Sequence, residues 1–408
     1  MQSFGDGIIS DETRALLEHS VGPHVDSFNY FLDAGIDEIV HDMQPMCLEL
    51  KEDEAADLDS FIKLEYEGIT ITQPMRVADR SISNSQITPR ECREGGISYT
   101  GATVVNVNID IGHSSVSITT KLGDIPIMVM SEKCHLKNHT GLQLLQGKEE
   151  ATEVGGYFIQ NGIERVIRLL QVPRRNQVMA IERNSYKNRG PSYSALGVAM
   201  RCCRPDQSSV TITLHYLNNG GCTLKFVLRK QEFLLPVVMV AKALVDISDK
   251  ELFDRIVQDE TNNTFLTTRL ELLLRDFKSY NLYTKHQCRS YLGSLFRGSL
   301  GRPDTESDEE AGLLLISRYL FVHTDAYPEK AECLLHMMRK LFSFAQGRCL
   351  ADNADAVMNH ELLLPGHLIT MYLKEKMEDA LINVRTAVKR DYKLNKVRNL
   401  YTLYTLYT

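Results

Sequence analysis

The sequence lacks tryptophan, any Cys-x-x-Cys pair and any long apolar run. Its nine cysteines are scattered, apart from the adjacent Cys202 and Cys203, so their spacing predicts neither a zinc ribbon nor a secreted disulfide framework. No stretch of about 18 uninterrupted apolar residues occurs, so we expect no membrane-spanning helix. The first residues, MQSFGDGIISDE, lack the basic and apolar regions of a signal peptide. These absences predict reduced thiols in the cytosol or nucleus.

Acidic and basic residues are concentrated in different parts of the chain, whose formal net charge is −7. Residues 1–67 contain 17 Asp and Glu against three Lys and Arg, and residues 160–204 contain nine Lys and Arg against two Glu. A local excess of positive charge attracts a phosphate backbone whatever the total charge is. The candidate nucleic-acid contacts in this basic stretch are Arg165, Arg168, Arg174, Arg175, Lys187 and Arg189.

Two other interpretations of the basic stretch stay open: a solvated surface and a contact with another protein subunit. The guanidinium group of arginine fits phosphate through paired hydrogen bonds, which favours a nucleic acid. Few aromatic residues accompany the cations, only Tyr157, Phe158 and Tyr186, so base stacking is not expected.

Hydrophobic periodicity predicts an α+β chain, and 408 residues with 43% hydrophobic side chains are enough for two or three domains. Strands are expected at residues 105–111, 116–122, 210–217 and 222–229, the last two joined by an Asn-Asn-Gly-Gly turn. Residues 125–130 are expected to be a buried apolar run, interrupted by Pro126. Helices are expected at residues 10–19, 22–35, 328–347 and 365–389, and from Leu244 onward, with capping boxes at Ser248, Thr284 and Ser307. Residues 51–59 and 304–310 are acidic and read as exposed loops.

No motif indicates catalysis or metal binding strongly. Cys134, His135 and His139 have the chemistry of metal ligands, but zinc sites need further ligands at suitable spacing, and none is nearby in the sequence. We expect these three side chains to pack in the interior or to cap a turn. The alternative is that they bind a metal ion and the protein is a metal hydrolase. The glycine pairs at 155–156 and 220–221 fit turns and match no phosphate-binding fingerprint.

Three blocks of the sequence resemble conserved blocks of the second-largest subunits of eukaryotic RNA polymerases. They are SFNYF with Gly35-Ile36 after it, GDIPIM followed by Cys134-His135-Leu136, and GGYFI followed by residues 161–167. Their order and spacing are similar to those of the protrusion domain of this family. Residues 167–170, 173–176, 188–194, 204–207 and 214–218 are similar to the polymerase I members of the family in particular.

This resemblance implies a domain organisation. A protrusion domain would be split between residues 23–187 and 356–399, and a mixed α/β lobe, residues 188–355, would be inserted in it. Residues 1–22 would form an N-terminal segment. Residues 400–408 repeat Leu-Tyr-Thr and are expected to be a tail foreign to the family, with the chain truncated before the catalytic parts of the subunit.

The resemblance also implies a function. The chain would be a non-catalytic N-terminal portion of DNA-directed RNA polymerase I, a nucleotidyltransferase that transcribes ribosomal RNA genes in the nucleolus. It would line the DNA cleft and contact the largest subunit, other polymerase I subunits and a TFIIF-like heterodimer at the lobe. Mg and Zn are expected only in the complete complex, and no membrane is involved. The alternative is a free-standing, nucleic-acid-binding or decoy protein derived from a truncated polymerase gene.

Overall fold

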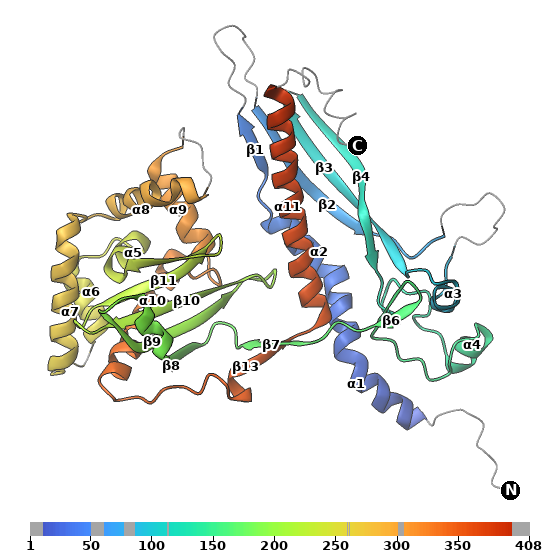
Figure 1. Cartoon of the computed structure of the whole chain (residues 1–408), viewed down its shortest axis with the longest axis horizontal. Coiled ribbons are helices and arrows are strands. Elements are labelled where there is room, and N and C mark those ends of the chain that lie inside the picture. Colours follow the sequence, from blue (N-terminus) through green and yellow to red (C-terminus); the bar gives the residue numbers. More distant parts are fainter. Residues whose placement is uncertain are drawn as a thin grey trace. The chain divides into compact units, whose positions relative to one another are not determined.

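The computed structural model describes residues 11–49, 61–76, 86–111, 114–258, 260, 262–300 and 306–393, and confirms the α+β class. The chain forms two compact units (Figure 1). Unit 1 comprises Met1–Leu170 and Leu362–Thr408, and unit 2 comprises Gln171–Glu361. The predicted acidic loop at residues 51–59, the first part of the loop at 304–310, and the tail at 400–408 lie outside the described residues.

Unit 1 begins with one nearly continuous helical segment instead of the two expected helices. α1 (Asp11–Tyr30) runs through Pro23, a π-helical turn (Phe31–Gly35) follows, and α2 (Ile36–Asp42) continues directly. Gly35 does not end the helix, because its backbone is right-handed helical, with φ −61°. Its role is steric: a Cβ atom there would lie 3.0 Å from Oγ1 of Thr370.

The sheet of unit 1 is antiparallel with the order β1-β2-β3-β4. Its strands are β1 (Met46–Glu49), β2 (Phe61–Ile71), β3 (Thr100–Ile111) and β4 (Ser114–Pro126). β3 confirms the predicted alternation, since Val105 and Val107 are buried and Asn106 between them is exposed. β4 is an edge strand, so the prediction that it is half-buried is wrong at Val116 and Leu122, which are exposed.

The segment after β4 fills the core of unit 1 before the chain forms a small hairpin. Ile127, Met128 and Val129 are fully buried, as the apolar run at residues 125–130 predicts. The short elements of this region are α3 (Pro89–Gly95), α4 (Gly141–Gln146), β5 (Phe158–Gln160) and β6 (Ile163–Arg165), the last two paired with each other. Gly155 and Gly156 both have positive φ angles, which glycine adopts readily, but they lie in an irregular segment and not in the turn expected there.

The last helix, α11 (Pro365–Lys393), closes unit 1 from the far end of the sequence. The spacing of Ile369, Leu373 and Met377 predicts one apolar face, expected to pack on the sheet of residues 100–170. The helix packs instead mainly against α1, the π-helical turn, α2 and β1 (Figure 1). Met377, Leu381 and Val388 are buried in the same core as Phe28 and Phe31. The same spacing places Lys374 on the opposite, solvated face, but Lys374 is buried and forms an ion pair with Asp42 of α2.

Unit 2 contains an antiparallel sheet of five strands with the order β12-β11-β10-β9-β8. The strands are β8 (Val178–Glu182), β9 (Tyr193–Cys203), β10 (Ser209–Leu217), β11 (Cys222–Leu228) and β12 (Gln231–Pro236). β10 and β11 form the expected hairpin, with φ +90° at Gly220. Because β8 pairs with β9, unit 2 begins at Gln171, earlier than the 187/188 boundary expected for the lobe.

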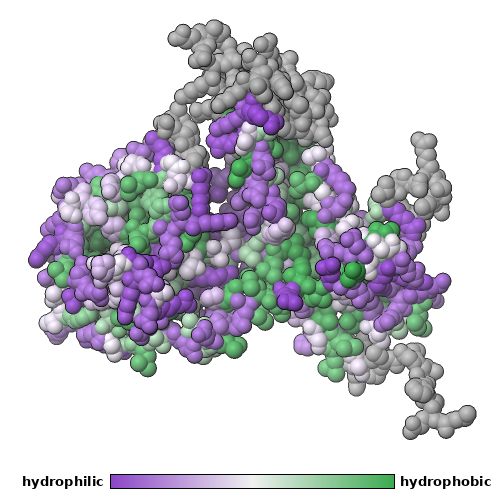
Figure 2. Space-filling view, viewed as in Figure 1, coloured by the Kyte–Doolittle hydropathy of each residue, from purple (hydrophilic) through white to green (hydrophobic). Residues whose placement is uncertain are grey.

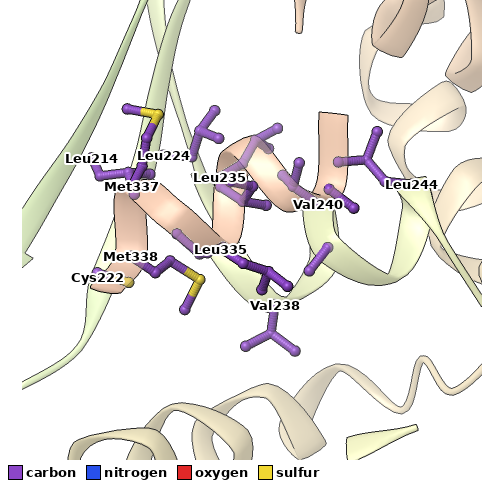
Figure 3. Packing of buried hydrophobic residues seen from close by; sticks show 14 of the residues in the cluster. Leu214, Cys222, Leu224, Leu235, Val238, Val240, Leu244, Leu335, Met337 and Met338 are labelled. Atoms are coloured by element: carbon purple, nitrogen blue, oxygen red, sulfur yellow. The ribbon is translucent and has the colours of Figure 1, made fainter. Parts of the chain in front are cut away.

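Helices cover this sheet. They are α5 (Val237–Leu244), α6 (Asp249–Val257), α7 (Thr264–Phe277), α8 (Lys285–Leu300), α9 (Asp308–Tyr319) and α10 (Tyr327–Ala345). The helical region thus starts before Leu244, because α5 is entirely buried and shows no polar face in its sequence. The capping boxes predicted at Ser307 and Thr284 are present, whereas Ser248 caps its helix through the backbone N–H of Glu251 alone. Figure 3 shows Met337 and Met338 of α10 packed with side chains of α5 and of the strands, in the hydrophobic core of unit 2.

Two short strands mark where the chain enters and leaves unit 2. β7 (Leu170–Pro173) and β13 (His360–Leu363) form a two-stranded sheet with each other. The backbone N–H of Arg174 donates to the carbonyl of Asn359, 2.9 Å away, just before β13. The beginning and the end of unit 2 are therefore held side by side.

The closing role of α11 predicts unequal effects of two substitutions on this helix. Met377→Ala removes a side chain that is 1% exposed and should lower the free energy of unfolding of unit 1 by about 2–5 kcal/mol. Ile382→Ala, at a position 61% exposed, should change it by less than about 0.5 kcal/mol. Hydrogen exchange of the β3 amides measures both. Equal protection in the two variants would show that α11 is a loosely attached helix.

Candidate functional site

The six candidate nucleic-acid contacts do not form one cluster. Arg165 and Arg168 belong to unit 1, whereas Arg174, Arg175, Lys187 and Arg189 belong to unit 2. Within unit 2, the candidates lie at two places: Arg174 and Arg175 follow β7, and the other two lie on the 3₁₀-helix Asn184–Arg189. Each group has different partners, so the groups have different chemical roles.

The two candidate contacts in unit 1, Arg165 and Arg168, are exposed. Arg165 ends β6, Arg168 follows it, and neither forms an ion pair with another residue of the described ranges. Glu164, the middle residue of β6, forms an ion pair with Arg93 at 3.1 Å, so the negative charge of Glu164 is partly neutralised. The charge of both arginines is thus available to an anionic partner.

Arg175 is held inside unit 2 by a carboxylate that the sequence did not point to. Its Nε lies 3.0 Å from Oε2 of Glu361, and Nη1 of Arg201 lies 2.5 Å from Oε1 of the same residue. Arg201 is buried, and its Nη1 also donates to the carbonyl of Pro173. Burial acts to raise the pKa of Glu361, but the hydrogen bonds from Arg175 and Arg201 outweigh it and hold the pKa below its usual range. A phosphate would have to compete with Glu361 for Arg175.

Arg189 is also held by an ion pair within unit 2, whereas Lys187 forms no ion pair with the described residues. The guanidinium carbon of Arg189 lies 5.3 Å from the centre of the Tyr186 ring, and Nη2 lies 2.9 Å from Oε2 of Glu232. Lys225 pairs with the same carboxylate. Lys187 is exposed and has no ion pair within the part of the chain that the structure describes. Of the two candidates on this 3₁₀-helix, Lys187 alone combines exposure with a charge that no described residue neutralises.

A buried histidine lies beneath Tyr186. His215 of β10 is 0% exposed, and its ring packs edge-on against Tyr186 and Tyr193, with centroids 4.5 and 5.9 Å away. Neither ring nitrogen has a hydrogen-bond partner among the described residues. Burial, reinforced by the positive charges of Arg189 and Lys225, lowers the pKa of His215 to about 4. The ring is therefore neutral at pH 7 and acts as an apolar support for the tyrosine.

An open groove of about 820 Å³ lies on unit 2 beside Arg174 and Arg175. Its other basic or imidazole side chains come from a distant part of the sequence: His323, His336 and Arg339. The groove is lined by Arg174, Arg175, Asn176, Gln177, Val178, Met200, His323, Glu332, Cys333, His336 and Arg339. Sequence reasoning missed the contribution of α10, because no pattern links residues so far apart. The packing of α10 against β8 and β9 brings them together.

Two of the three possible metal ligands, Cys134 and His135, have ordinary structural partners, whereas Nδ1 of His139 is buried without a hydrogen-bond partner among the described residues. Sγ of Cys134 accepts a hydrogen bond from the hydroxyl of Tyr99 at 3.5 Å, and Nε2 of His135 lies 2.8 Å from the carbonyl oxygen of Pro74. Among the described residues, no group of three or more His, Cys, Asp or Glu side chains could hold a metal ion. In the same ranges, no helix is long and apolar enough to cross a membrane.

Comparison with known proteins identifies relatives of the chain. A family model described as RNA polymerase beta subunit matches residues 19–406. The chain is 42% identical over 382 residues to the probable DNA-directed RNA polymerase I subunit RPA2 of Schizosaccharomyces pombe, covering 92% of this chain and 32% of the relative. For the RNA polymerase I subunit RPA2 of Homo sapiens, the identity is 36% over 404 residues, covering 98% and 35%. The chain thus spans about a third of the length of the curated relatives it matches.

The environment of His215 predicts acid sensitivity of unit 2. Between pH 6.5 and about 4 the ring binds a proton in the unfolded chain but not in the folded one, so stability falls as the pH decreases through this range. The loss should be on the order of 3 kcal/mol, and His215→Phe should abolish most of it. Hydrogen exchange of the β10 amides at several pH values measures the effect. As a control, His286→Phe replaces an imidazole whose side chain is 70% exposed and should keep the slope. An unchanged slope in His215→Phe would refute this explanation.

Proposed function

The chain belongs to the RNA polymerase beta subunit family, and we propose that it is the N-terminal portion of the second-largest subunit of DNA-directed RNA polymerase I. The observation that carries this proposal is 36–42% identity over nearly the whole chain to relatives named as this subunit in fungi and human. The three sequence blocks with the same resemblance all lie within residues 19–406, which the family model matches.

Unit 1 then corresponds to the protrusion domain and unit 2 to the lobe. A domain split between the two ends of the chain, with a second domain inserted in it, is the organisation that the family resemblance implies. The structure supports this proposal because α11 packs against α1 across the whole of unit 2 in the sequence. The proposed boundaries move to Leu170/Gln171 and Glu361/Leu362, where the two units divide.

The complete complex is a nucleotidyltransferase, but this portion of the subunit holds no active centre in our proposal. The family's catalytic segments belong to the rest of the subunit and to the largest subunit, and so do its Mg and Zn ions. The chain then assembles with the largest subunit and the other polymerase I subunits in the nucleus, at the nucleolar ribosomal RNA genes. A TFIIF-like heterodimer at the lobe remains part of this proposal.

The function of the basic residues in this assembly is to attract the DNA backbone. Arg165, Arg168, Arg174 and Lys187 support it best, because they are exposed and make no ion pair with the described residues. Arg175 and Arg189 are already paired with Glu361 and Glu232, so their contribution to DNA binding is smaller. Contacts of this kind would be independent of base sequence and sensitive to salt.

Purification from the source organism tests the proposed function. A tag placed at residue 1 should copurify the largest subunit of polymerase I and peptides of the same polypeptide from beyond residue 408. The purified complex should elongate a primed template in the presence of nucleotides and Mg²⁺. The isolated 408-residue chain should not, which serves as the control. Recovery of the 46.3 kDa chain alone, without polymerase subunits, would favour a free-standing protein instead.

The exposed cations of unit 1 predict a change in salt dependence. Each phosphate contact contributes about 0.9 to the slope of log K against log salt concentration. Arg165→Ala combined with Arg168→Ala should therefore flatten the slope for duplex DNA by about 1 to 2, without a preference for base sequence. Fluorescence anisotropy at several salt concentrations measures this slope. Arg90→Ala, at an arginine paired with Glu94, is the control and should leave the slope nearly unchanged. Equal slopes in all variants would assign Arg165 and Arg168 to a protein contact or to solvent.

A further inference from the structure

The groove of unit 2 contains polar groups whose bonding capacity is unused. Gln177, His323 and Arg339 each carry a buried polar atom, Oε1, Nδ1 and Nε respectively, with no hydrogen-bond partner in the described part of the chain. Buried polar atoms without partners are uncommon in folded proteins, because each loses the hydrogen bonds it would make with water. Three of them among the residues lining one groove indicate a place where a ligand supplies the missing bonds.

Two of these three atoms, Nδ1 of His323 and Nε of Arg339, can donate hydrogen bonds and favour an anion, whereas Oε1 of Gln177 is an acceptor. Sγ of Cys333 lies 3.6 Å from Nε2 of His323. In the tautomer in which the thiol donates to Nε2, the imidazole proton lies on Nδ1, which is then a donor, as Nε of Arg339 is. Arg174 adds an exposed guanidinium group. The acidic residue of the groove, Glu332, is partly neutralised by Arg255 at 3.3 Å.

Exposed apolar side chains lie next to the basic groove. Asn359 accepts hydrogen bonds from two groove residues, from the backbone N–H of Arg174 at 2.9 Å and from Nε2 of Gln177 at 3.4 Å. The two residues before it, Val357 and Met358, are 80% and 79% exposed. Figure 2 shows hydrophobic and hydrophilic residues intermixed on the visible face of unit 2. A phosphate backbone gains nothing from covering valine and methionine, whereas a protein partner buries them favourably.

We propose that this groove binds a peptide segment of a partner protein, in which acidic side chains stand next to apolar ones. The carboxylates would meet Arg174, Arg339 and His323, and the apolar side chains would cover Val357 and Met358. This inference rests on unit 2 alone and does not depend on the proposed polymerase function. It assigns Arg174 to a protein contact rather than to DNA.

Selection from a displayed library of random 12-residue peptides tests the proposal with the full 408-residue chain. Enriched peptides should combine Asp or Glu with large apolar residues. Arg174→Ala with Arg339→Ala should weaken the binding of these peptides at least about tenfold, and Val357→Ser with Met358→Ser should have a similar effect. Arg275→Ala, at an exposed arginine on α7, is the matched control and should change it by less than about twofold.

Several outcomes would overturn the proposal. One is enrichment of peptides without acidic residues, and another is failure to enrich any peptide that distinguishes the chain from its Arg174→Ala, Arg339→Ala variant. A third is duplex DNA that competes with the selected peptides and loses affinity in the same variant, which would make the groove a nucleic-acid site. Because Arg339 is half-buried, Met358→Ser alone, on the exposed surface, keeps the test valid if the double arginine variant unfolds.

Discussion

The contact between α1 and α11 is the constraint on which unit 1 depends, because it joins the two ends of the chain around an inserted unit. The helices approach so closely that a Cβ atom on Gly366 would lie 1.7 Å from the carbonyl oxygen of Ser27, and the backbone N–H of Gly366 donates to the hydroxyl of Ser27 at 3.2 Å. Further along α11, the missing side chain of Gly35 leaves room for Thr370, and Lys374 forms an ion pair with Asp42. Backbones that pack this closely hold the helices in one register, so Met377, Leu381 and Val388 enter the core behind Phe28 and Phe31.

Local sequence patterns predicted the elements of this fold well, and tertiary contacts decided the rest. Alternation in β3, the Asn-Gly turn between β10 and β11, and the serine caps depend on residues within a few positions of one another. The burial of Lys374 could not be read from α11, because it depends on a carboxylate in α2. Similarly, Gly35 looked like a helix stop until Thr370, from the far end of the chain, explained its missing side chain. Such pairings exist only after the chain has folded.

The same distinction applies to the candidate site. Counting charges found the basic stretch, but charge alone does not tell a free cation from a neutralised one. Glu361 and Glu232 occupy Arg175 and Arg189, while Arg165, Arg168 and Lys187 keep their charge unpaired among the described residues. The groove could not be predicted from the sequence for another reason. Arg174 and Arg339 line it together only because α10 packs on the sheet that contains β8 and β9. A linear stretch of positive charge therefore divides into surfaces with different partners.

The insertion of unit 2 is compatible with the α1–α11 contact because the two ends of unit 2 are bonded to each other. β7 pairs with β13, and the backbone N–H of Arg174 donates to the carbonyl of Asn359. The carboxylate of Glu361 forms ion pairs with both Arg175 and Arg201. Closing a flexible loop costs entropy that rises with its length, whereas a folded insert with adjacent ends acts as a short connection. Glu361 is central to this arrangement, since it ties β13 to the residues after β7 and to β9. By bonding the ends of unit 2 to each other, this carboxylate allows a long insertion between helices that must meet.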